Sequence, residues 1–423
     1  MEKNSNILRK RSTRWFPIFV VVWGIVQLAC VIGCYNNEMG PDALGYTRHA
    51  IQCYNEGTFY PSINNLHDVY VQAPGLVNFL IPIYAVFGDV RIFLFLNIIM
   101  NIAILLETVY LGEKFFNKTV GYIAGVCYAI ILANIFAPVV LGSEILYLFL
   151  ALTGFVISLK AKPIPLISAG ILYAVAYTVR PLVLAFLVAS IVYYIYVKRK
   201  WLRNSLITIA CFAIPLIALG EINQQRLGTP IVSSTTGGYN LLMTAYDKAT
   251  PLPEHSIFYK SDGIGHPYLS SKYTFAERDS IWMSMAVSWI KEHPFRYLVL
   301  CGERVFIMWN KDVWSVPNFL PDHLDNPTYA IASGSKTRMI VCQAIRMCYS
   351  IVYYVVCVLF LISIVKYRKE ILSGKGIMLL ILLLGIGGTC LFPMEHRYHY
   401  PYMFILCIWV AYYISNRLEK GNK

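Results

Sequence analysis

The chain has 423 residues, of which 57% are hydrophobic and 14% carry a charged side chain. Ordinary soluble domains contain about 25% charged residues, so this composition excludes a water-soluble enzyme. Nearly continuous apolar runs alternate with short polar connectors, and a helical span needs about 20 apolar residues whose backbone hydrogen bonds close within the segment. The sequence therefore predicts an all-α polytopic membrane protein.

The formal net charge of +13 comes from the connectors between the apolar runs. Basic residues gather in segments 3–14, 114–118, 160–162, 198–203, 366–375 and 417–423. Basic loops favour the cytoplasmic face, so this pattern sets the topology and does not indicate a nucleic-acid-binding surface. We expect both termini in the cytoplasm and no nucleic-acid partner. All eight histidines lie outside these connectors, which places the available polar chemistry at the outer face.

The eleven cysteines are scattered, mostly within apolar runs, and no CxxC pair occurs. This pattern indicates neither a disulfide framework nor a zinc site. Only Cys34 and Cys53 are placed to meet on the outer side, and we do not expect a bridge between them.

Ten apolar runs are predicted to span the membrane with these bounds: 15–34, 92–111, 119–137, 145–159, 164–178, 181–197, 205–221, 339–365, 376–392 and 402–414. The first resembles a signal-peptide core, but it is long and lacks a small-residue cleavage site, so we expect it to be retained. A further run at 73–88 would place two basic loops outside if it crossed. We therefore interpret it as a re-entrant or interfacial helix.

The predicted organisation has three parts: an N-terminal transmembrane module at 1–221 with an outer loop at 35–72, a mixed outer domain at 222–338, and C-terminal transmembrane helices at 339–423. Within the outer domain, the apolar stretch 295–310 is interrupted by Arg296, Glu303 and Arg304 at helical spacing. This pattern indicates an amphipathic helix that lies at the surface.

Asp42 follows the first span by eight residues, in the segment EMGPDALGYTRHA, where a short helix is predicted after Pro41. A partly desolvated carboxylate at membrane-surface height is suited to take a proton from an acceptor hydroxyl. The alternative is that Asp42 caps the helix, and position alone favours the cap.

Glu144 lies at the outer end of a span, in APVVLGSEILYLF. Acidic residues at such positions are functional candidates by default. Glu144 would bind a divalent cation together with Asp42, or hold a sugar hydroxyl. Capping of the following helix is an equal alternative.

Arg180 and Arg91 lie beside apolar runs, in AYTVRPLVLAF and FGDVRIFLF, and each guanidinium needs an anion. A planar fork of donors favours phosphate, whereas snorkelling to headgroups is the alternative. The segment LFPMEHRYHYPYM, residues 391–403, is the densest polar cluster at any span boundary. Tyrosines alone would fit an interfacial belt, but two histidines, an arginine and a glutamate favour anion recognition.

These features, in this order, resemble the GT-C superfamily of integral-membrane glycosyltransferases, especially bacterial relatives of protein O-mannosyltransferases and the lipid A aminoarabinose transferase. The resemblance rests on Asp42, the segment APGLVNFLIPIYAVFGDVR, Glu144, Arg180-Pro181, HPFRYLVLCGERVFIMW and Arg397-Tyr398. The sequence departs from the family pattern at Gln72-Ala73-Pro74, where relatives have two prolines or a preceding charge. It departs again at Ala43, where relatives have a second acid.

The resemblance implies inverting transfer of a sugar from a polyprenyl-phosphate carrier to a lipid, glycan or protein acceptor, at the periplasmic face of the inner membrane. Asp42 would be the general base and Glu144 a ligand of the acceptor or of a metal such as Mg²⁺ or Mn²⁺. The residues implied to bind the donor phosphate are Arg397, Tyr398, Arg180 and His396. The residues that would line the cleft are Arg91, Gly238, Tyr239, Asn240 and His293, although a glycine pair at 237–238 also fits a simple turn.

A transporter or lipid flippase is the main alternative, since it would also be polytopic and basic inside. Transporters often have repeated halves and polar residues near the bilayer midplane. Here the spans carry few charges, with Glu107 as the exception, and the acidic residues cluster outside. A non-catalytic scaffold is a third reading, and it would need neither Asp42 nor Arg397. The sequence favours the enzyme and leaves the sugar and the acceptor open.

Overall fold

The computed structural model describes residues 15–37, 39–198, 200–312, 314–315 and 336–421. Over these residues the regular secondary structure is helical, without strands. The first basic cluster, at 3–14, lies outside the described residues.

The helices up to residue 227 are α2 (Trp15–Cys34), α3 (Pro41–Glu56), α4 (Pro74–Phe87), α5 (Phe93–Phe115), α6 (Lys118–Ile130), α7 (Leu132–Phe136), α8 (Ser143–Ser158), α9 (Pro163–Val179), α10 (Leu184–Val197) and α11 (Trp201–Leu227). The later helices are α12 (Gly237–Leu242), α13 (Ser256–Tyr259), α14 (Phe275–Glu292), α15 (Pro294–Trp309), α19 (Lys336–Lys366), α20 (Arg368–Ile371), α21 (Ile377–Thr389) and α22 (Met403–Gly421). Short 3₁₀ turns are η1 (Ile63–Asn65), η2 (Val90–Ile92), η3 (Ala137–Val139), η4 (Pro181–Val183), η5 (His266–Leu269), η6 (Gly374–Gly376) and η7 (His396–Tyr402).

Each of the ten predicted spans coincides with a helix, and the run 119–137 is divided into α6 and the α7–η3 segment, bent by 72°. By length and composition, the described helices able to cross a membrane are Trp15–Cys34, Val90–Phe115, Trp201–Leu227 and Arg346–Lys366, with the bent pair as a fifth. The other apolar helices are shorter. The chain is thus a helical integral membrane protein, and α11 continues six residues past the predicted boundary at 221.

The predicted re-entrant run 73–88 forms the helix α4, which ends at Phe87 and is followed by Gly88. Gly88 has a φ of +70°, the left-handed conformation that favours glycine at the end of a helix. The 14 residues of α4 extend about 21 Å, which is shorter than the roughly 30 Å hydrocarbon core. Pro82 also lies inside it. A length below the bilayer thickness agrees with a helix that does not cross, and the placement of α4 at the interface stays a prediction.

The break between α6 and α7 is stabilised by side chains that pair with freed backbone groups. Asn134 Nδ2 donates to the Tyr128 carbonyl at 2.8 Å, and Trp23 Nε1 donates to the Ala129 carbonyl at 3.1 Å. Asn101 Nδ2 donates to the Asn134 carbonyl at 2.7 Å. Because lipid offers no hydrogen bonds, a helix can break inside a membrane protein only where such partners exist.

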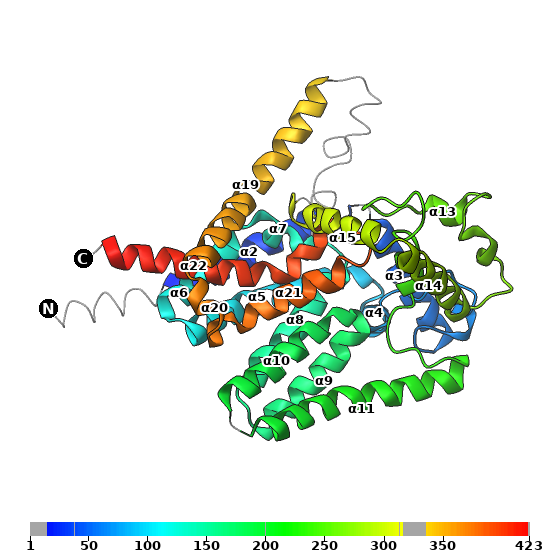
Figure 1. Cartoon of the computed structure of the whole chain (residues 1–423), viewed down its shortest axis with the longest axis horizontal. Coiled ribbons are helices and arrows are strands. Elements are labelled where there is room, and N and C mark those ends of the chain that lie inside the picture. The colour runs from blue at the N-terminus through cyan, green and yellow to red at the C-terminus, as the bar shows by residue number, and fades with distance from the viewer. Residues whose placement is uncertain (1–14, 38, 199, 313, 316–335, 422–423) are drawn as a thin grey trace.

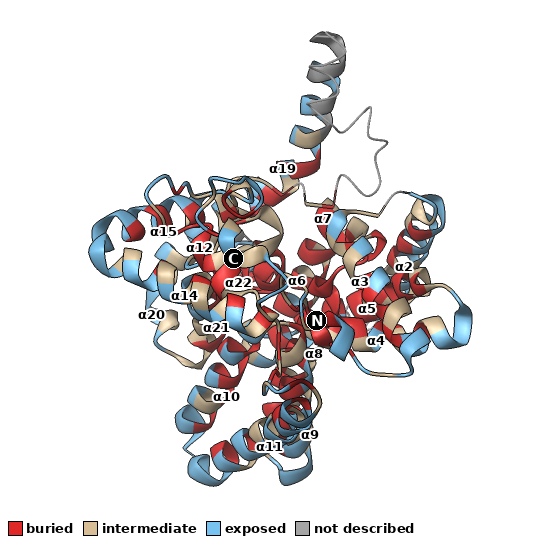
Figure 2. Cartoon of the chain, turned by 90° about the vertical axis from the view of Figure 1, so that its right-hand side faces the viewer, coloured by how far each residue is buried: buried red, intermediate tan, exposed pale blue. Residues whose placement is uncertain are grey.

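The helices α5, α8, α21 and α22 run along the long axis of the molecule, and α9, α10 and α11 lie on one side of them (Figure 1). Figure 1 also places α20 and the end of α22 at one end of the molecule and α3, α13 and α14 at the other. Buried residues concentrate between the helices, whereas α11 is exposed along much of its length (Figure 2). Large apolar side chains remain exposed on α2, α11 and α19, as expected for surfaces that contact lipid.

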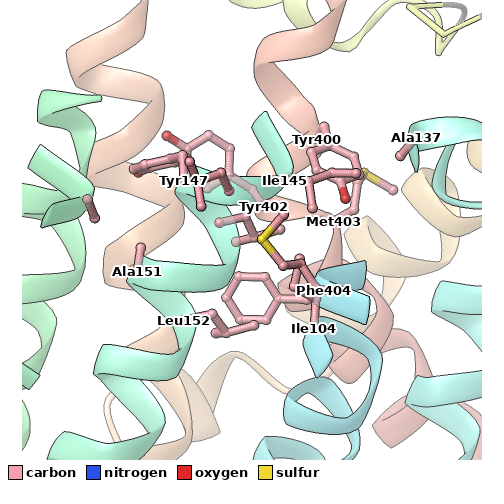
Figure 3. Close-up of a cluster of buried hydrophobic side chains, with 14 of the residues drawn as sticks. Ile104, Ala137, Ile145, Tyr147, Ala151, Leu152, Tyr400, Tyr402, Met403 and Phe404 are labelled. Carbon is pink, nitrogen blue, oxygen red and sulfur yellow. The ribbon is translucent and has the colours of Figure 1, made fainter. Parts of the chain in front are cut away.

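A fully buried apolar cluster fills the space between α8, α5 and the start of α22 (Figure 3). Tyr147 and Leu152 come from α8, Ile104 from α5, and Tyr402 and Phe404 from the chain around the start of α22. Tyr147 lies one helical turn after Glu144, and Tyr402 follows the polar segment of η7. This buried cluster therefore lies next to the polar residues at the ends of these helices.

The outer segment does not have the expected mixed architecture, because its described residues form helices and loops. Its apolar core is centred on Tyr239, Phe258 and Trp282, and Tyr70 of the first outer loop packs against it. Within the same segment α15 is amphipathic, as predicted. Its Arg304 points inward and is fully buried, however, and its exposed face carries the apolar residues Phe295, Leu298 and Phe306.

Arg278 of α14 joins this outer segment to the first outer loop. Its side chain is 1% exposed and donates to the carbonyl oxygens of His67, Asp68, Tyr268, Leu269 and Ser270. A buried guanidinium needs such acceptors, and the carbonyls would be unpaired without it.

Replacement of Arg278 by Gln is expected to lower the free energy of unfolding by about 2–4 kcal/mol, because several buried carbonyl groups lose a charged donor. Thermal unfolding of the purified chain in detergent measures the change. The exposed Arg296 of α15 provides the control, and Arg296→Gln should unfold like wild type. Equal stabilities of the two variants would contradict the role assigned to Arg278.

Candidate active site

Five charged side chains from separate parts of the chain meet where α8 begins and α9 ends. We call this group the ionic cluster; its members are Asp42, Glu144, Arg180, Glu395 and Arg397. Asp42 is in the first turn of α3, Glu144 is in the first turn of α8, and Arg180 is the residue that ends α9. The fold therefore brings together the main residues that the sequence singled out.

Arg397 of η7 is the centre of the ionic cluster. Its Nη2 lies 2.7 Å from Asp42 Oδ2, and its Nε lies 2.6 Å from Glu395 Oε2 and 3.6 Å from Glu144 Oε1. Burial opposes the charge, but the surrounding carboxylates, with Glu144 foremost, raise the pKa of Arg397 well above its ordinary value. The guanidinium is therefore a permanent positive charge between three carboxylates.

Arg180 holds the buried end of the same cluster. Its Nη2 lies 2.5 Å from Glu144 Oε1, and its Nε donates to Ser143 Oγ at 2.8 Å. The guanidinium carbons of Arg180 and Arg397 lie 5.6 and 5.8 Å from the centre of the Tyr398 ring. The aromatic ring thus contacts both cations and helps hold them near one another.

Neither acid caps its helix by a side-chain hydrogen bond. The N-cap residues of α3 and α8 are Gly40 and Gly142, and a Cβ on Gly142 would lie 2.5 Å from Glu144 Oε2. Both carboxylates still benefit from the positive end of a helix dipole. The structure therefore contains no N-cap side-chain hydrogen bond from Asp42, whereas Glu144 does lie in the first turn of α8, as its helix-end alternative expects.

The two acids differ in their access to solvent. The Glu144 side chain is 3% exposed, whereas the Asp42 side chain is 39% exposed. Gln72 Nε2 donates to Asp42 Oδ1 at 3.0 Å, which leaves Asp42 oriented by one neutral and one charged donor. Asp42 is thus the carboxylate that an incoming molecule can reach, and Glu144 is the internal one.

His396 and His399 attach the back of η7 to the end of α15 and lie away from the ionic cluster. His396 Nδ1 lies 2.9 Å from the Ile307 carbonyl oxygen, and burial lowers the pKa of His396 to about 4. His399 lies between the Met308 carbonyl, 2.8 Å from Nδ1, and Asp312 Oδ1, 3.0 Å from Nε2. A neutral His396 facing α15 is placed as an anchor of η7 and not as a phosphate ligand.

The residues predicted to line a cleft occupy other places in the described structure. Arg91 donates to the Tyr35 carbonyl at 3.1 Å and lines a separate small cavity near the end of α2. Gly238 and Tyr239 of α12 belong to the core of the outer segment, where a Cβ on Gly238 would lie 2.0 Å from the Asp279 carbonyl oxygen. The glycine serves close packing of α12 against α14.

The other two predicted cleft residues are also away from the ionic cluster. Asn240 follows Tyr239 in α12, and its backbone N–H donates to the Thr236 carbonyl at 2.9 Å. His293 ends α14 and stacks on Trp289 with ring centres 4.8 Å apart. Neither makes an ion pair with a cluster member among the described residues.

A divalent cation does not fit the space between Asp42 and Glu144 as these side chains are arranged. The guanidinium of Arg397 occupies that space and contacts both carboxylates. Within the described part of the chain, no group of three metal-binding side chains comes together. The positive charge that a metal would supply at this point is already supplied by the two arginines.

Three residues that contact the ionic cluster or support η7 carry no recognisable signal in the sequence. Gln72 and Ser143 directly precede Ala73 and Glu144, but nothing in their sequence neighbourhood indicates a contact with Asp42 or Arg180. Asp312 binds His399 across a separation of 87 residues, for which a single sequence carries no signal.

No protein-family model matches the sequence, and no curated protein matches it either. The structure shares its fold with a solved protein. It is similar to the archaeal oligosaccharyltransferase AglB from Archaeoglobus fulgidus, which was solved in complex with an inhibitory peptide and a dolichol-phosphate. The TM-score is 0.51 at 12% sequence identity, and the match covers 97% of this chain and 51% of AglB. The chain thus spans about half the length of AglB, and the similarity establishes the fold alone.

Substitution of Glu144 by Gln is expected to lower the free energy of unfolding by about 3 kcal/mol, because two largely buried guanidinium groups lose their shared carboxylate. The matched control is Glu113→Gln. Glu113 pairs with Lys118 at 3.9 Å on the surface, with side chains 45% and 69% exposed, so its loss should change stability by less than about 1 kcal/mol. Chemical or thermal unfolding in detergent compares the variants, and an equally mild effect of both would show that the ionic cluster is not structural.

Proposed function

We propose that the chain is an inverting glycosyltransferase that moves a sugar from a polyprenyl-phosphate donor to an acceptor at the outer membrane face. The observation that carries this proposal is the ionic cluster, where two guanidinium groups lie beside one solvent-accessible carboxylate at the ends of membrane helices. An anionic lipid phosphate and a proton acceptor are the two requirements of this reaction. The GT-C fold shared with an enzyme solved with dolichol-phosphate supports the same class of donor.

The distribution of charge supports an outward orientation for this site. Glu144 and Arg180 lie at one end of α8 and α9, while Lys160 and Lys162 lie in the connector at the other end of the same two helices. Because basic connectors favour the cytoplasmic face, the ionic cluster faces the opposite side in this proposal.

Donor binding would rearrange the partners of Arg397. The cluster holds three carboxylates and two guanidinium groups, and the carboxylates of Asp42 and Glu395 are 39% and 44% exposed. Phosphate oxygens can replace these two accessible partners because Arg presents a fork of donors that suits phosphate. The buried Glu144 stays in place and keeps both arginines positioned.

The release of Asp42 from Arg397 would prepare it to act as the general base. Exchange of this partner for phosphate would free Asp42 Oδ2 to accept a hydrogen bond from the acceptor hydroxyl. The acceptor hydroxyl oxygen then attacks the anomeric carbon as its proton passes to Asp42. The bond from that carbon to the phosphate oxygen breaks, and Arg397 and Arg180 stabilise the charge on the departing lipid phosphate. A single displacement inverts the anomeric centre.

Asp42→Asn is expected to reduce sugar transfer by about 100- to 10 000-fold, because the amide cannot accept the acceptor proton. Transfer is measured with the purified chain in liposomes, using a panel of polyprenyl-phosphate sugars and lipid, glycan and peptide acceptors. The exposed Asp262 of the outer segment provides Asp262→Asn as the control, which should match wild type. A donor and acceptor pair that Asp42→Asn uses as fast as wild type would disprove the assigned base.

Arg397→Lys is expected to transfer sugar at least tenfold more slowly than wild type, and Arg397→Gln more slowly still. Lysine keeps the charge but loses the planar fork that contacts three carboxylates and the phosphate, whereas glutamine loses both. The same transfer assay ranks the variants. Arg48 is exposed on α3, and Arg48→Gln should retain the wild-type rate; an Arg397→Gln enzyme of normal rate would contradict the phosphate role.

A further inference from the structure

The helix α15 carries apolar side chains on two faces, and one of these faces is exposed. Phe295, Leu298, Val299 and Phe306 form the exposed face, and their side chains are between 53% and 83% exposed. Residues three, four and seven positions apart lie on the same side of a helix, so these four form one row, which we call the apolar stripe. An exposed apolar patch of this kind marks a surface that meets another molecule or a membrane.

The opposite face of α15 fixes the rotation of the helix. Arg304 is fully buried, and it donates from Nη1 to the Cys390 carbonyl at 3.1 Å and from Nη2 to the Thr244 carbonyl at 2.9 Å. The Tyr297 hydroxyl, on the same face, donates to the Leu391 carbonyl at 2.5 Å. A rotation that buried the apolar stripe would break all three hydrogen bonds, two of which come from a charged donor. The stripe is therefore held facing outward.

The inner face of α15 binds the chain that leaves a membrane helix. Cys390 and Leu391, whose carbonyls accept these hydrogen bonds, directly follow the apolar helix α21, and Arg397 comes six residues after Leu391. The end of an apolar membrane helix marks the boundary of the hydrocarbon region. The helix α15 therefore lies at a membrane boundary, on the same side as the ionic cluster.

The far end of α15 contacts a second membrane helix, α19. The Trp309 carbonyl accepts a hydrogen bond from the Tyr353 hydroxyl at 2.9 Å. The Asn310 carbonyl accepts one from the Tyr354 hydroxyl at 3.1 Å. Both tyrosines belong to the part of α19 that is long and apolar enough to cross a membrane, Arg346–Lys366, and this span exposes large apolar side chains. The surface next to α15 is thus one that contacts lipid.

The charged side chains on the exposed surface of α15 lie at one edge of the apolar stripe. Arg296 and Glu303 are both exposed, and their spacing of seven residues places them on one side of the helix. A helix at a membrane boundary turns its apolar side toward acyl chains and its charged side toward headgroups and water. The arrangement of charge on α15 follows this rule.

We propose that α15 is a membrane anchor whose apolar stripe inserts among the acyl chains of the phospholipids around the ionic cluster. The anchor also supports η7, because His396 Nδ1 lies 2.9 Å from the Ile307 carbonyl oxygen and His399 Nδ1 lies 2.8 Å from that of Met308. The bilayer thereby helps hold the segment that carries Arg397. This contact with lipid does not depend on the function proposed above.

The test introduces the photoreactive amino acid p-benzoylphenylalanine at one position of the full-length chain at a time. The chain is placed in nanodiscs of phosphatidylethanolamine and phosphatidylglycerol and irradiated, and intact-mass spectrometry measures the fraction that gains one phospholipid. The probe replaces Phe295 or Phe306 of the apolar stripe. The control position is Tyr259, an exposed aromatic residue of α13, at the end of the molecule opposite α20 (Figure 1).

We expect about fivefold or more lipid adduct from the probe at Phe295 and at Phe306 than from the probe at Tyr259, because only the stripe lies among acyl chains. Equal yields at all three positions would overturn the proposal, as would adducts of the stripe with a second copy of the chain in place of lipid.

The substituted side chains are largely exposed, so the probe leaves the packing of the inner face in place. If one stripe variant does not fold, the same probe at Val299 replaces it. Sugar transfer is not needed for these measurements, so failure of the proposed enzyme function and failure of the anchor proposal remain distinguishable.

Discussion

The guanidinium of Arg397, shared by three carboxylates, is the interaction on which the site depends. A charge that is mostly removed from water needs close partners. Here those partners are Asp42 of α3, Glu144 of α8 and Glu395 just before η7, and Arg180 at the end of α9 completes the group. Segments separated by hundreds of residues are thereby fixed at one place. The requirement to pair this charge explains both why the helices meet as they do and why the polar residues face one another.

Packing and hydrogen bonds hold the chain around the ionic cluster in place. Tyr147 and Tyr402 are buried next to it, the histidines of η7 attach that segment to α15, and Arg278 joins the outer segment to the first outer loop. Preorganised charges of this kind stabilise a developing anion without reorganising during the reaction. The accessible edge consists of Asp42 and Glu395, so movement of side chains, and not of helices, is what donor binding requires in this proposal.

The helices were predictable from the sequence because their signal is local: apolar runs of sufficient length, prolines at their starts and glycines at their ends. The prominent site residues were predictable for a related reason, since Asp42, Glu144, Arg180 and Arg397 are charges at the boundaries of apolar runs. Contacts between residues far apart in the sequence were not predictable. Gly238 of α12 was predicted to line the cleft, but it serves close packing of α12 against α14. The buried position of Arg304 depends on the carbonyl groups of Thr244 and Cys390, which are far from it in the sequence.

In the proposed function, the ionic cluster recognises the phosphate of a lipid carrier. Equilibrium binding of a fluorescent polyprenyl phosphate and of the matching polyprenol, to the wild-type chain and to Arg397→Gln, tests this recognition without any sugar transfer. Wild type should bind the phosphate lipid at least tenfold more tightly than the alcohol, a difference of about 1.4 kcal/mol, and Arg397→Gln should lose this preference. Equal affinity of wild type for the phosphate and the alcohol would contradict the phosphate-binding role of the ionic cluster.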